Sequence, residues 1–91
     1  MSWTEDEYVE YLAGERRRFA WTMHRYGELT PIEAENAALE RYPYESPHTP
    51  YRGLIFHDEA WQWALLEIYG EDYPRTHPEL VTPPAEYGAL D

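Results

Sequence analysis

HDEAWQWALLEIYG, residues 57–70, decides the expected fold of this 91-residue chain. From Ala60 to Tyr69 only Gln62 and Glu67 interrupt an apolar surface that surrounds nearly the whole helical wheel, and a helix that is apolar all round is a buried one. We therefore predict a central helix from Asp58, its N-cap, to Tyr69, just before a glycine. The expected core is built on its large apolar side chains: Trp61, Trp63, Leu65, Leu66 and Ile68.

A first helix is predicted upstream by a capping box. The Thr4 hydroxyl and the Glu7 carboxylate have the spacing that satisfies free amides at the start of a helix. This helix is expected to run from Thr4 to Tyr26, with a kink or break near Gly14, because glycine weakens a helix interior. The predicted core stripe recurs at helical spacing and comprises Tyr8, Tyr11, Leu12, Phe19, Met23 and Tyr26.

A second capping box predicts a shorter helix. Thr30 and Glu33 supply the box, and Pro31 occupies the first helical position, where its missing amide proton costs nothing. The helix is expected to run from Pro31 to Tyr42 and to end before Pro43. Its apolar face is thin, so it is placed at the edge of the bundle.

Prolines dominate the remaining segments. Three of them in residues 43–53 predict an extended, polyproline-like loop. The apolar run 54–56 is expected to be a lone extended piece, since no partner strand is evident. Four prolines in residues 71–91 limit the tail to short turns. The residues expected to anchor this tail are Tyr73, Leu80 and Tyr87.

Length and pattern together predict one all-α domain over residues 1–91. The expected architecture is a small three-helix bundle with a hydrophobic central third helix and a proline-rich loop. The irregular tail, residues 71–91, is expected to pack on the bundle or to be partly mobile.

Composition excludes several kinds of chemistry. Eighteen acidic residues and seven arginines give a net charge of −11, with neither lysine nor cysteine. There is consequently no lysine for a Schiff base and no thiolate for a metal or a disulfide. The cysteine-free composition fits a reducing compartment, and neither a signal peptide nor a membrane-spanning run is evident. A cytoplasmic protein without a membrane partner is expected.

Catalytic and metal sites find little support. His57 lies beside two acids, but no histidine has a ligand one turn away on an inward face. Ser46 and Thr49 flank His48 in a proline-rich loop without an oxyanion-hole motif. We expect no catalytic residue, no cofactor and no metal. A small enzyme or metal-binding protein using His57 and nearby carboxylates is the weakest alternative.

The only basic cluster is Arg16-Arg17-Arg18, with Arg25 two turns further on. Acidic residues lie within one or two turns of it on the same predicted helix, which favours salt bridges along the helix surface. Because the net charge of −11 repels phosphates, direct binding of nucleic acid is not expected.

The acidic surface gives the leading functional hypothesis, a protein-interaction module that binds a basic partner protein as an inhibitor or regulator. The alternative is a nucleic-acid mimic that blocks a DNA- or RNA-binding protein. Aromatic residues on the first helix and in the loop suit either packing or recognition. The candidate partner-binding residues are Trp21, Glu33, Glu35, Glu40, Tyr44, Tyr51, Glu71 and Asp72.

Overall fold

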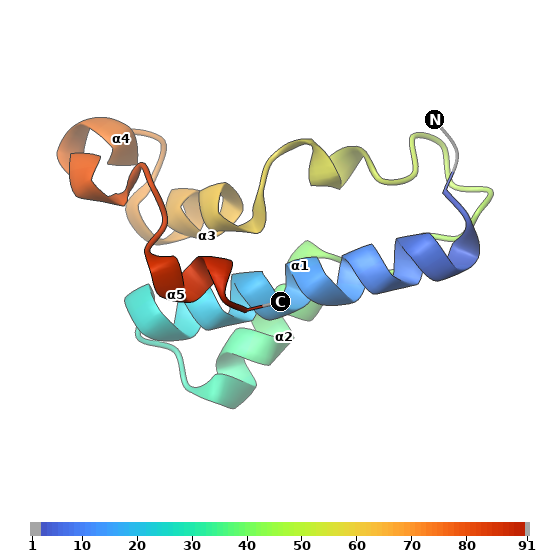
Figure 1. Cartoon of the computed structure of the whole chain (residues 1–91), viewed down its shortest axis with the longest axis horizontal. Helices are drawn as coiled ribbons and strands as arrows, with labels where there is room; N and C mark the ends of the chain where they lie inside the picture. Colours follow the sequence, from blue (N-terminus) through green and yellow to red (C-terminus); the bar gives the residue numbers. More distant parts are fainter. Residues whose placement is uncertain (1–2, 91) are drawn as a thin grey trace.

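The computed structural model describes residues 3–90, and these contain helices and no strand, which confirms the all-α prediction (Figure 1). The elements run in the order α1 (Glu5–Tyr26), α2 (Pro31–Arg41), η1 (Leu54–His57), α3 (Ala60–Tyr69), α4 (Tyr73–Thr76), η2 (Pro78–Leu80) and α5 (Ala85–Gly88). The elements labelled η are short 3-10 helices.

α1 begins at the predicted capping box and continues without a break. The backbone amide of Thr4 donates to Glu7 Oε1 at 3.0 Å, and that of Glu7 donates to Thr4 Oγ1 at 3.1 Å. The predicted break near Gly14 is wrong, because this glycine is a buried residue of an intact helix. A Cβ at this position would lie 3.2 Å from Arg18 Nη1. Gly14 therefore makes room for the arginine one turn later.

α1, and not α3, is the central helix. It packs extensively against both α2 and α3, and in Figure 1 α3 lies above α1 while the start of α2 lies below it. A bundle arranged around the third helix was the prediction, and this part of it is corrected. The core stripe of α1 buries Tyr8, Leu12, Phe19 and Met23. Tyr11, which was predicted to belong to it, is exposed.

α3 divides its side chains between two apolar clusters. Ala60 and Ala64 pack with residues of α1 and α2, whereas Trp61 and Leu65 pack with Tyr73 and the C-terminal tail. The rest of the predicted core is only half-buried: Trp63, Leu66 and Ile68. The other helices and the tail cover only part of the surface of α3. The helix is therefore less buried than we predicted from a sequence that is apolar on nearly every side.

α2 follows its predicted start closely. The amide of Thr30 donates to Glu33 Oε1 at 2.9 Å, and that of Glu33 donates to Thr30 Oγ1 at 3.2 Å. The helix ends at Arg41, one residue before the predicted end, and the next residue, Tyr42, turns into the core, where its ring lies edge-on to Phe19.

The start of α3 differs from the prediction. Its N-cap is Glu59 and not Asp58, and the Glu59 amide donates to Gln62 Oε1 at 3.3 Å. The preceding residues 54–57 form the 3-10 helix η1 instead of an extended piece. Gly53 enters this turn in the left-handed region, at φ 85°, which costs glycine little because it lacks a Cβ.

The tail folds back over Trp61. The Trp61 indole Nε1 donates to the carbonyl oxygen of Leu80 at 2.8 Å, and the Trp61 amide donates to the hydroxyl of Tyr87 at 3.1 Å. Tyr73 and Tyr87 are buried, and Leu80 is half-buried. The three residues expected to anchor the tail thus all contact the core.

Truncation of a buried leucine should destabilise the protein more than truncation of an exposed leucine. Leu65 is fully buried, so Leu65→Ala should lower the free energy of unfolding by about 2–5 kcal/mol. The matched change at an exposed position of α2, Leu39→Ala, should cost less than about 1 kcal/mol. Urea unfolding followed by circular dichroism measures both. Equal losses for the two variants would contradict the assignment of the core.

Candidate functional site

A buried carboxylate lies where α1 meets α3. Glu15 is 4% exposed, and the backbone amide of Ala60, the first residue of α3, donates to its Oε2 at 3.2 Å. The Tyr11 hydroxyl also hydrogen-bonds to this carboxylate, and Arg18 Nη1 lies 3.8 Å from its Oε1. The negative charge thus faces the free amides at the start of a helix, where it is stabilised by the helix dipole.

Burial controls the titration of this cluster. Loss of water raises the pKa of Glu15, and the hydrogen bond from Tyr11 and the charge of Arg18 only partly oppose this rise. Burial also raises the pKa of Tyr87 to about 12, and burial followed by the charge of Glu15 raises that of Tyr42. Glu15 and Tyr87 accept hydrogen bonds from the first two amides of α3, so their visible role is to fasten α1 and the tail to the start of that helix.

The other groups considered for catalysis or metal binding lie in exposed turns. His57 Nε2 is 3.5 Å from Asp58 Oδ2, and its ring lies edge-on to Trp63. Across residues 3–90 there is no group of three or more His, Asp or Glu side chains arranged to hold a metal ion. In the loop, Ser46 Oγ lies 3.2 Å from Thr49 Oγ1 within a turn closed by the amide of Thr49.

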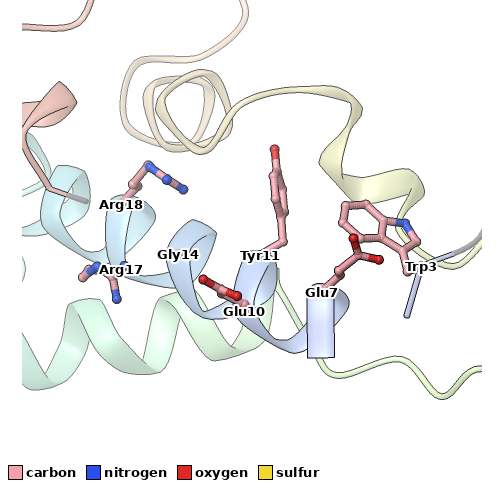
Figure 2. Close-up of a pocket in the computed structure, with 7 residues that line it drawn as sticks. All are labelled: Trp3, Glu7, Glu10, Tyr11, Gly14, Arg17 and Arg18. Carbon is pink, nitrogen blue, oxygen red and sulfur yellow. The ribbon is translucent and has the colours of Figure 1, made fainter. Parts of the chain in front are cut away.

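A hollow of about 550 Å³ runs along the N-terminal half of α1 (Figure 2). Its lining residues are Trp3, Glu7, Glu10, Tyr11, Gly14, Arg17 and Arg18. Figure 2 shows two carboxylates and, further along the helix, two arginines. Several of these groups serve the fold, since Glu7 caps α1 and Arg18 lies beside Glu15. The hollow therefore offers few groups for a ligand.

The predicted acidic residues of α2 do not share one face. At about 100° per residue, Glu33 and Glu40 lie within about 20° of each other, and Glu35 lies about 140–160° away. Glu33 accepts the capping hydrogen bond from Thr30, which lowers its pKa. Glu40 lies near Glu67 of α3, whereas Glu35 faces α1.

The two acids predicted at the start of the tail also differ. Asp72 Oδ2 lies 2.8 Å from Arg75 Nη2, and Glu71 is exposed beside it. Both lie at the turn before α4, well separated along the chain from the acids of α2. The predicted acidic set is therefore dispersed over at least two places on the surface.

Two of the predicted aromatic residues are engaged within the chain. The ring of Trp21 is partly buried against Tyr26 and Tyr87. The Tyr44 hydroxyl donates to Glu5 Oε2, and this bond, together with one from Arg52, lowers the pKa of Glu5. They hold the tail and the loop, respectively, against α1.

Tyr51 differs from them, since it is 82% exposed and has a left-handed backbone at φ 58°. Tyr51 thus combines a backbone conformation that is unfavourable for a residue with a Cβ with an aromatic ring that lies in solvent.

A groove between α1 and α2 was not anticipated from the sequence. Its first part, about 370 Å³, is lined by Arg16, Arg17, Ala20, Glu35, Ala38 and Leu39. Its second part, about 170 Å³, is lined by Ala20, Trp21, His24, Pro31, Ala34 and Glu35. The two parts share Ala20 and Glu35 and together form what we call the α1–α2 groove. The sequence offered no signal for this groove, because the exposure of Leu39 is seen only in the structure. Trp21 borders the same groove.

No protein-family model matches the chain, and no curated protein or solved structure was found to be similar to it. None of the helices in the described part of the chain is long and apolar enough to span a bilayer.

The raised pKa of Glu15 predicts a pH-dependent stability difference. A carboxyl group whose pKa is higher in the folded than in the unfolded state contributes stability below the unfolded pKa, and this contribution is lost as pH rises through the folded pKa. Relative to Glu15→Gln, the wild type should therefore lose stability as pH rises above 4.5, the ordinary value. Urea unfolding of both proteins between about pH 4 and pH 7 measures this. A difference that stays constant with pH would contradict it.

Proposed function

We propose that this protein is an acidic protein-interaction module that binds a basic partner protein, chiefly through the residues displayed on α2. The observation that carries the proposal is the large excess of negative charge. The net charge is −11, which exceeds the magnitude of about 2–8 that keeps a small domain soluble. An excess of this size favours long-range attraction of a basic surface.

The arginines support the proposal because most of them are held by the chain's own groups. Four of them lie within 4 Å of a carboxylate on another element or in the same turn: Arg25 to Glu86, Arg41 to Glu67, Arg52 to Glu5 and Arg75 to Asp72. Arg16 Nε donates to the carbonyl oxygen of Tyr42 at 2.8 Å, and Arg18 lies beside Glu15. The acidic residues outnumber the arginines that pair with them, so we expect the excess negative charge to govern how this surface interacts with another molecule.

Neutralising the acids of α2 should weaken binding without unfolding the helix. We expect the combined change Glu33→Gln, Glu35→Gln and Glu40→Gln to slow association by about an order of magnitude and to flatten its salt dependence. Glutamine has nearly the helix propensity of glutamate and also completes a capping box. The partner is first captured from an extract of the source cells at low salt, and association with the purified protein is then followed on a biosensor.

The matched control removes the same three charges elsewhere, by Asp6→Asn, Glu10→Gln and Glu28→Gln, all at exposed positions. The association rate of this control variant should lie closer to that of the wild type than the rate of the α2 variant does. The proposal fails if no captured protein is basic, or if binding survives the α2 change at every salt concentration. Displacement of the captured protein by DNA would instead favour the nucleic-acid mimic.

A further inference from the structure

We propose that the α1–α2 groove is a docking site for an amphipathic helix of a partner protein. The apolar stripe of that helix packs on the alanine floor, and its basic edge lies along α2. This inference rests on the proposed function, because it specifies which surface and which kind of segment the basic partner uses. Three features of the groove support it: its floor, its exposed apolar rim and the charges of its two walls.

The floor of the groove is made of small residues from both helices. Ala34 and Ala38 of α2 are buried against α1, and Ala20 of α1 is half-buried and lines both parts of the groove. Short alanine side chains let the two helices pack closely and leave a shallow surface between them, on which the ridges of a third helix can lie. A groove with such a floor accepts larger side chains, such as leucine, from a partner.

An apolar rim follows the groove on α2. Ile32 is 66% exposed and Leu39 is 52% exposed. They are seven residues apart and therefore lie on the same face about two turns from each other. Leu39 itself lines the groove. A partner that covers this rim removes two large apolar side chains from water, which favours association.

The length of the groove sets the length of the partner contact. From Pro31 to Leu39 the helix rises about 12 Å at 1.5 Å per residue. About two turns of a partner helix match this span, so contact residues at positions i, i+3 or i+4, and i+7 are expected.

The two walls of the groove carry opposite charge. Glu35 stands on the α2 wall and lines both parts of the groove, whereas Arg16 and Arg17 stand on the α1 wall. A helix whose lysines or arginines lie beside Glu35, on the edge away from Arg16 and Arg17, complements this arrangement of charge. The net charge of −11 favours an excess of basic residues on it.

The experiment uses two synthetic peptides of about five turns and identical composition. The first has a leucine stripe at helical spacing, lysines along one edge and fewer glutamates along the other. The second is a scramble without a stripe. Fluorescence anisotropy measures the dissociation constant of each for the whole chain at low and high salt, and the striped peptide should bind about tenfold more tightly.

Two variants each replace an exposed leucine by aspartate, one inside the groove and one outside it as a control. Leu39→Asp should weaken binding of the striped peptide about tenfold, although the added negative charge attracts the lysines. Leu54→Asp, at a leucine that is 63% exposed and lies in η1, should leave the dissociation constant within about twofold. Ile32→Asp is a second variant whose folding is favoured, since an acid suits the first turn of a helix. Circular dichroism confirms that all three variants fold.

Each other outcome overturns the docking site and bears differently on the proposed function. Equal, salt-sensitive binding of both peptides, unaffected by Leu39→Asp, leaves the electrostatic function standing without the groove. If neither peptide binds, the docking proposal is wrong, and the capture experiment then tests the proposed function on its own. A wild-type dimer in sedimentation that Leu39→Asp converts to a monomer assigns the groove to a second copy of this chain.

Discussion

One buried hydrogen bond, from the first amide of α3 to a carboxylate of α1, ties these two helices to each other. Glu15 accepts from the amide of Ala60, and this contact fixes where α3 begins along α1. Burying a carboxylate is costly, and the cost is only partly offset here, because an otherwise unsatisfied amide and the positive end of a helix receive the charge but the pKa of Glu15 stays raised. With its start held at this point, α3 turns Ala60 and Ala64 toward α1 and Trp61 toward the tail.

Local sequence motifs predicted the helices well, but the sequence did not predict how the helices pack together. The capping boxes at Thr4 and Thr30 lie within four residues, so the sequence contains all that is needed to recognise them. The central place of α1 depends on contacts between residues far apart in the chain. The same limit explains Glu15, whose partner Ala60 is 45 residues away, and Gly14, whose role depends on where the Arg18 side chain lies.

The candidate surface was predictable residue by residue but not as a shape. Trp21 and Glu35 were both identified from the sequence, and both line the α1–α2 groove. A groove, however, exists only once two helices are placed side by side. Counting acids along α2 also grouped Glu35 with Glu33 and Glu40, because a sequence shows proximity along the chain more readily than direction around a helix.

The closure of the tail over Trp61 gives the chain an order of assembly. The indole and amide of Trp61 are satisfied by Leu80 and Tyr87, which follow it by 19 and 26 residues. During synthesis from the N-terminus the ribosome releases α3 before either of these residues. One apolar side of α3 thus stays uncovered until the tail emerges, and the cluster of Trp61, Leu65 and Tyr87 can form only once Tyr87 has left the ribosome.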